Sequence, residues 1–72
     1  MLTAKELGER IQEARVAAGL SRSELAELLY FSRDSVWGWE KGRCFPTVPT
    51  VAELCVHLNV SPAWLLGLEG EK

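Results

Sequence analysis

Apolar residues recur at helical spacing along most of the chain, and capping residues mark where each periodic segment begins. Thr3 is followed three residues later by Glu6, which is the pattern of a capping box at a helix N-terminus. Apolar residues then repeat every three or four positions until Gly19, a residue that commonly ends a helix. This pattern predicts a first helix from about Ala4 to Ala18.

Two shorter periodic segments follow. Ser21 and Glu24 form a second capping box, and the apolar spacing after it supports only about two helical turns. Ser32 can cap a third segment, which ends at Gly42. The middle of the chain is therefore predicted to hold two short helices joined by a tight turn.

The C-terminal part predicts two more helices. Either Thr47 or Thr50 caps the first of them, and Asn59 is suited to the left-handed residue that stops it. Ser61 followed by Pro62 then starts a fifth helix. Since no segment alternates long enough to make a strand, the fold class predicted is all-α with five helices.

The inward faces of these helices define a predicted core of twelve residues. They are Leu7, Ile11, Leu25, Ala26, Leu29, Val36, Trp39, Val51, Leu54, Leu58, Trp64 and Leu65.

Composition narrows the class of protein. Seventy-two residues, 47% hydrophobic and 25% charged, fit one globular domain over 1–72. A net charge of −2 argues against a protein that coats nucleic acid non-specifically, so any DNA contact must come from local placement of charge. No apolar run approaches the roughly 18 residues of a membrane span, and we expect a cytoplasmic protein with no membrane partner.

The sequence shows no motif for a metal site, a cofactor site or a catalytic site. Cys44 and Cys55, with His57 as the one histidine, do not match the spacing of zinc ligands, and we expect no metal and no cofactor. Neither a nucleophile motif nor a phosphate-cradling glycine loop occurs, so the chain is not expected to be an enzyme. No small-molecule ligand is evident.

The stretch LSRSELAELLYFSRDSVWGWEKG, Leu20 to Gly42, resembles the helix-turn-helix of the lambda-repressor and Cro-like family, also called the xenobiotic-response-element family. The flanking segments LGERIQEAR and PTVPTVAELCVHLNVSPAWLLG resemble the family's remaining helices, so the similarity covers nearly the whole chain. It implies a compact five-helix domain with the helix-turn-helix at about 21–42 and a flexible tail at about 67–72. The recognition helix, about Arg33–Lys41, is then expected in the major groove of duplex DNA.

The resemblance also implies structural roles and shows two departures. Arg15 and Glu40 match positions that pair in this family and tie the first helix to the end of the third. Tyr30 stands where the family usually has glycine, so either the turn is rebuilt or Tyr30 is strained. Arg22 stands where the family often has glutamine, and it can hold a phosphate bidentately.

Five residues of the third helix are candidates for base contacts, each with a plainer alternative. They are Arg33, Asp34, Ser35, Trp37 and Gly38. Arg33 suits guanine O6 and N7 but could hold a phosphate or be merely solvated. Asp34 could accept from cytosine N4 or simply stabilise the helix N-terminus, and Ser35 could be an ordinary exposed serine. Trp37 could touch a thymine methyl, edge the core or anchor a partner, while Gly38 would admit close approach of the backbone.

Four further residues form the expected phosphate-binding rim: Ser21, Arg22, Lys41 and Arg43. A solvated charged surface is the ordinary explanation for any one of these cations and a weaker one for the three together.

The function expected is a sequence-specific DNA-binding transcriptional regulator, repressor-like, acting as a homodimer on a two-fold operator. A dimer is expected because one such module reads too few bases to be selective, and the region Asn59 to Leu66 is the expected interface. The alternative is a protein-interaction module, or an antitoxin-like partner on the same fold, with weak or no DNA binding. The net acidity, Asp34 and Trp37 motivate that alternative.

Overall fold

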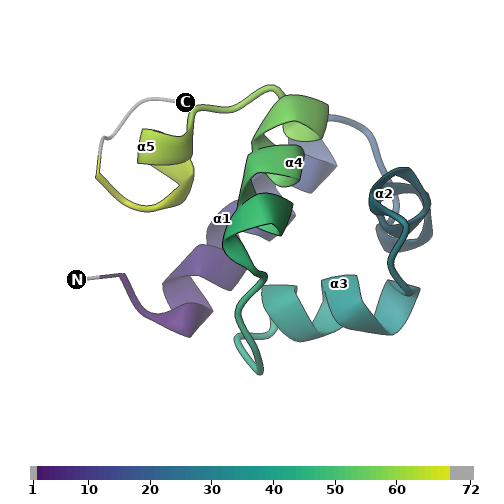
Figure 1. Cartoon of the computed structure of the whole chain (residues 1–72), viewed down its shortest axis with the longest axis horizontal. Coiled ribbons are helices and arrows are strands. Elements are labelled where there is room, and N and C mark those ends of the chain that lie inside the picture. The colour runs from purple at the N-terminus through teal and green to yellow at the C-terminus, as the bar shows by residue number, and fades with distance from the viewer. Residues whose placement is uncertain (1, 69–72) are drawn as a thin grey trace.

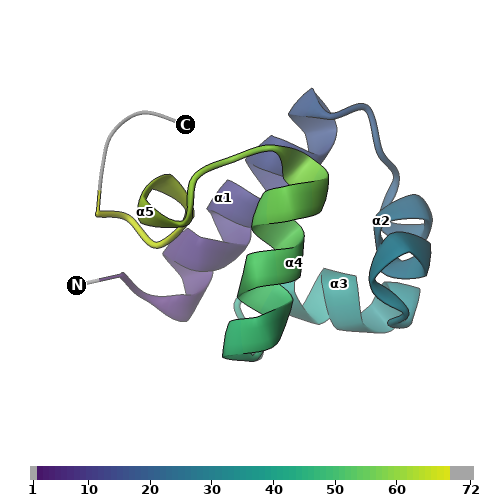
Figure 2. The same cartoon turned by 45° about the horizontal axis from the view of Figure 1, so that its top comes forward.

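Five helices make up the described part of the chain, residues 2–68, in a computed structural model (Figure 1). They are α1 (Ala4–Ala17), α2 (Arg22–Leu29), α3 (Arg33–Glu40), α4 (Val48–Leu58) and α5 (Pro62–Leu65). Between residues 2 and 68 there is no strand, which confirms the all-α prediction. Figures 1 and 2 show α4 crossing in front of α1, with α2 and α5 at opposite ends of the molecule.

The helix ends lie where capping residues predicted them. Thr3 Oγ1 accepts from the Glu6 N–H at 3.1 Å, and the Glu6 carboxylate accepts from the Thr3 N–H at 3.0 Å. Ser21 and Glu24 repeat this reciprocal pair at 3.0 and 2.8 Å. Since each carboxylate accepts a backbone N–H, the pKa values of Glu6 and Glu24 are lowered. The two capping boxes thus fix the start of α1 and of α2.

The tight turn after α2 has a left-handed residue. Tyr30 has φ 59° and ψ 38°, and its side chain is 95% exposed. The next N–H, of Phe31, donates to the Ala26 carbonyl at 2.9 Å and closes the end of α2. Of the two possibilities for this turn, Tyr30 is therefore the strained one: it adopts a left-handed conformation that costs a residue with a Cβ about 1 to 2 kcal/mol.

The start and end of α4 follow the sequence signals with one change. Thr47 is the N-cap residue by backbone geometry, but its hydroxyl caps no backbone N–H and instead lies 2.9 Å from the Thr50 hydroxyl. Pro49 lies in the first turn, where a missing N–H is tolerated. Asn59 ends the helix with φ 55°, as predicted.

The buried core joins all five helices of the described chain. Eleven of the twelve predicted core residues are buried, and Ala14 and Cys55 join them. Val51 was predicted to be buried and is only half-buried, because it packs at the margin of the core rather than inside it. The Phe31 ring meets Trp39 edge to face, with 5.1 Å between centroids. Burial raises the pKa of the Cys55 thiol, as expected of a small core residue.

A glycine sets how closely α1 and α3 pack. A Cβ added to Gly8 would lie 2.5 Å from the Glu40 carbonyl oxygen and would also overlap the Trp39 carbonyl. Only a residue without a Cβ lets the α1 backbone rest directly on the last turn of α3. Gly8 therefore fixes the distance between the first helix and the expected recognition helix.

Two sequence expectations concern the C-terminal tail and the membrane. Gly67 and Leu68 donate backbone hydrogen bonds to the carbonyls of Trp64 and Ala63, which closes the turn after α5. The rest of the expected flexible tail, 69–72, lies outside the described residues. Among the helices of residues 2–68, none is long and apolar enough to cross a membrane.

Candidate nucleic-acid interface

The exposed side of α3 is set by how the helix is capped and packed. Ser32 Oγ accepts from the Ser35 N–H at 3.2 Å, so α3 begins at Arg33. Val36 and Trp39 are buried against the core, and this places Arg33 and Asp34 in solvent at the other side of the first turn. Ser35 is half-buried as a residue, and its hydroxyl lies 3.0 Å from the Ser32 hydroxyl, so the hydroxyl already has a partner.

The pose of α3 is held by a buried carboxylate and two arginines. Glu40 has no exposed side-chain surface. Arg15 Nε and Nη2 donate to its two oxygens at 2.6 and 3.1 Å, and Arg15 Nη1 donates to the Leu20 carbonyl at 2.8 Å. Arg22 Nε donates to Glu40 Oε1 at 2.8 Å. One carboxylate therefore connects α1, the start of α2 and the end of α3.

The loop after α3 packs on α3 itself. The Arg43 guanidinium carbon lies 5.1 Å from the centre of the Trp37 ring, within cation–π range. A Cβ on Gly38 would come within 3.2 Å of the Cys44 sulfur, and Gly38 is buried. Within the fold, the missing side chain of Gly38 therefore leaves space for the neighbouring Cys44 side chain. The close approach of the Gly38 backbone to DNA stays a prediction.

Six of the expected contact residues surround a shallow hollow on this face. They are Arg22, Arg33, Asp34, Trp37, Gly38 and Arg43, and we call this the α3 hollow. The remaining expected residues do not line it. Lys41 is exposed at the C-terminal cap of α3, and the Ser21 hydroxyl caps α2. Three segments of chain thus supply cations to one surface: the start of α2, the first turn of α3 and the loop after α3.

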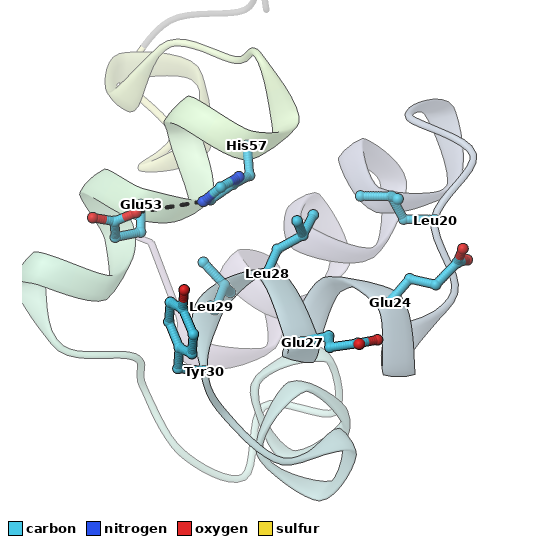
Figure 3. A pocket seen from close by; sticks show the side chains of 8 residues that line it. All are labelled: Leu20, Glu24, Glu27, Leu28, Leu29, Tyr30, Glu53 and His57. Carbon is cyan, nitrogen blue, oxygen red and sulfur yellow. Dashed lines mark ion pairs between the residues drawn. The ribbon is translucent and has the colours of Figure 1, made fainter.

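Charge differs between the faces of the molecule. The α3 hollow has three arginines and one acid, Asp34. A second hollow, between α2 and α4, is lined by Glu24, Glu27 and Glu53 together with leucines, Tyr30 and His57 (Figure 3). His57 Nε2 lies 3.5 Å from Glu53 Oε2 there. The net charge of −2 is therefore compatible with a positive α3 face, because acids gather on other surfaces.

Sequence reasoning missed two backbone contacts that locate this face. Gly8 was not singled out, although it sets the approach of α1 to α3. Gly42 was taken only as a helix stop, but it has φ 73° and a Cβ there would lie 2.9 Å from the Lys5 Cα. The start of α1 therefore lies beside the end of α3. No local sequence signal announces either contact, since both depend on which backbone arrives from another helix.

Comparison with known proteins identifies relatives over most of the chain. A family model described as a helix-turn-helix domain matches residues 6–65. The HTH-type transcriptional activator BcrR of Enterococcus faecalis is 35% identical over 64 residues, which are 89% of this chain and 31% of the relative. The chain spans less than half the length of the curated relatives it matches.

Solved structures agree in fold. The restriction-modification controller protein C.AhdI from Aeromonas hydrophila is 32% identical, with a TM-score of 0.79 over 86% of this chain and 94% of that one. The P22 c2 repressor, solved in complex with a synthetic operator, is 25% identical, with a TM-score of 0.81 over 88% of this chain and 96% of that one. With five helices within residues 2–68, a capped helix-turn-helix and these matches, the chain belongs to the lambda-repressor/Cro-like helix-turn-helix family of transcriptional regulators.

Proposed function

We propose that this chain binds duplex DNA in a sequence-specific way and regulates transcription, with α3 as the recognition helix. The observation that carries the proposal is the α3 hollow, where arginines from α2, α3 and the following loop surround one exposed helix face. Cations placed on both sides of a helix are suited to the two phosphate backbones that flank a major groove. The P22 c2 repressor, which shares this fold, was solved on a synthetic operator.

In this arrangement the contacts divide by position. Arg33, exposed at the start of α3, is assigned to a guanine edge, since its fork matches the O6 and N7 acceptors. Lys41 and Arg43, at the end of α3 and beyond it, are assigned to phosphates, together with Arg22. Asp34 is the weakest candidate, because an exposed carboxylate near phosphates is repelled unless it accepts from a cytosine amino group.

The regulator is proposed to act as a homodimer and without catalysis. Two copies on a two-fold operator double the number of bases read, which one short helix cannot supply alone. The proposal requires no cofactor, and no cluster of three metal-binding side chains lies within residues 2–68.

Two variants separate base reading from phosphate binding. Arg33→Ala should cost about 1 to 3 kcal/mol on the preferred duplex and relax selectivity at one base pair of each half-site. Lys41→Ala should weaken binding to all sequences alike and flatten the salt dependence by roughly one unit for each phosphate that is no longer bound. Binding would be measured on a duplex selected from a random pool and on a scrambled duplex, at several salt concentrations.

Two outcomes would contradict the proposal. If Arg33→Ala loses equal affinity for the selected and the scrambled duplex, Arg33 does not read a base. Absence of wild-type binding at low salt would overturn DNA binding itself and favour the protein-interaction module on the same fold.

A further inference from the structure

The Arg22 side chain donates one hydrogen bond inside the protein, and its other N–H groups can bind a ligand. It is the first residue of α2, and its side chain is 23% exposed. Its Nε donates to Glu40 Oε1 at 2.8 Å, which is the only hydrogen bond of this side chain to a residue of the described chain. The two terminal amino groups have no such partner there, and Arg22 lines the α3 hollow. The guanidinium thus has one edge on a carboxylate and another edge free for an anion.

Glu40 is a fixed point for that contact. Its side chain has no exposed surface, and both of its oxygens accept from Arg15. Arg15 is itself anchored to the Leu20 carbonyl at 2.8 Å, two residues before Arg22. The carboxylate cannot follow a moving partner, because it is held on both oxygens in a packed interior.

We propose that Glu40 is a positioning residue for DNA: it orients the Arg22 guanidinium so that the two terminal amino groups hold one backbone phosphate. This inference rests on the proposed function. A guanidinium has donors on separate edges of a rigid plane, so it serves the carboxylate and the phosphate together. Its rotamers are restricted before DNA arrives, so binding loses less side-chain freedom than it would with a free arginine.

The variant Arg22→Lys tests whether DNA binding requires a guanidinium that contacts Glu40 with one edge and a phosphate with another. Lys retains the charge but concentrates its donors at one point, so an ammonium paired with Glu40 is withdrawn from the phosphate. For Arg22→Lys we expect a loss of affinity of about tenfold on the selected duplex, near that of Arg22→Gln. The salt dependence should flatten by about 0.9 units in both variants. Thermal unfolding would be followed in parallel to show that each variant is folded.

Arg43→Lys is the charge-conserving comparison at a second proposed phosphate contact. Arg43 has no carboxylate partner within the described chain and contacts the face of Trp37, where an ammonium is also attracted. We expect this variant to keep the wild-type salt dependence and to lose less than about threefold in affinity. A purely electrostatic role for Arg22 would make the two lysine variants behave alike.

A double-mutant cycle tests the part assigned to Glu40. Glu40→Gln should weaken DNA binding more when Arg22 is present than it does in Arg22→Gln, where the orienting contact is already gone and only the contact with Arg15 is still lost. Additive losses would overturn the inference and leave Glu40 a residue of the fold alone. Wild-type affinity and salt dependence in Arg22→Lys would overturn it as well. Failure of the wild-type protein to bind DNA is a separate result, which overturns the proposed function instead.

Discussion

At the residue scale, the chain tolerates backbone strain at Tyr30, the last residue before the loop that joins α2 to α3. Tyr30 has the left-handed backbone of a helix-ending residue, and its ring lies almost wholly in solvent. Little packing energy offsets the cost of that conformation, which is about 1 to 2 kcal/mol for a residue with a Cβ. The turn is therefore determined by the helices on either side of it and not by the preference of Tyr30.

Replacing this residue should stabilise the domain. For Tyr30→Gly we expect a gain of about 0.5 to 1 kcal/mol, because relief of the left-handed strain exceeds the extra chain entropy of glycine in the unfolded state. Denaturant unfolding would measure it as a higher midpoint with an unchanged slope. Asn59→Gly is the control: Asn59 has φ 55° in the same kind of turn, but asparagine tolerates this region. Equal gains at both positions would show that glycine acts in some other way.

At the scale of helices, local signals were sufficient for the elements and insufficient for their contacts. Capping boxes at Thr3 and Ser21 predicted where α1 and α2 begin, because the bonds involved are made within one turn. The role of Gly8 could not be predicted, since it depends on carbonyls of α3 that lie more than thirty residues away in the sequence. The contact between Gly38 and Cys44 depends likewise on the path of the loop.

At Gly8, local helix preference and tertiary packing predict opposite effects of alanine on stability. In an isolated helix, alanine is favoured over glycine by roughly 1 kcal/mol. In the domain, Gly8→Ala should instead destabilise by about 1 to 3 kcal/mol, because the new methyl overlaps the carbonyls of Trp39 and Glu40 and forces α1 away from α3. Thermal or denaturant unfolding would measure the change.

Gly38→Ala is the matched helix position for that experiment. Its Cβ would meet only the Cys44 sulfur, at 3.2 Å, and a thiol at the end of a rotatable side chain can move. We expect a much smaller effect on stability there. A neutral or stabilising Gly8→Ala would mean that the two helices separate at little cost, and the close crossing would then not fix the pose of α3.

At the scale of the whole molecule, the candidate site is assembled from parts that only the fold brings together. Arg33, Lys41 and Arg43 could be assigned from their places on or near one helix. The link from Arg22 through Glu40 to Arg15 joins three helices. Only its Arg15–Glu40 pair was expected from the sequence, and only through the family resemblance. The acidic hollow between α2 and α4 was not predicted at all, because its glutamates come from two separate helices.

The proposed dimer is the property of the whole molecule that DNA binding depends on most. Leu66, at the end of the expected interface Asn59 to Leu66, is 37% exposed. Leu66→Asp would place a charge in any apolar interface formed there. Val16→Asp is the control, because Val16 is an exposed residue near the end of α1 and lies outside the expected interface. Both variants should keep the fold, since neither residue belongs to the buried core.

The two variants should differ on DNA with two half-sites. A dimer gains affinity because its second contact is intramolecular, an effect on the order of 10² or more, so Leu66→Asp should lose most of that gain while Val16→Asp retains it. On a duplex with a single half-site the two variants should bind alike. Sedimentation would measure the assembly directly, with the wild-type protein expected as two copies per duplex when the half-sites are about one helical turn apart. A wild-type protein that sediments as a monomer even on such a duplex would contradict the dimer, because the DNA itself then fails to bring two copies into contact.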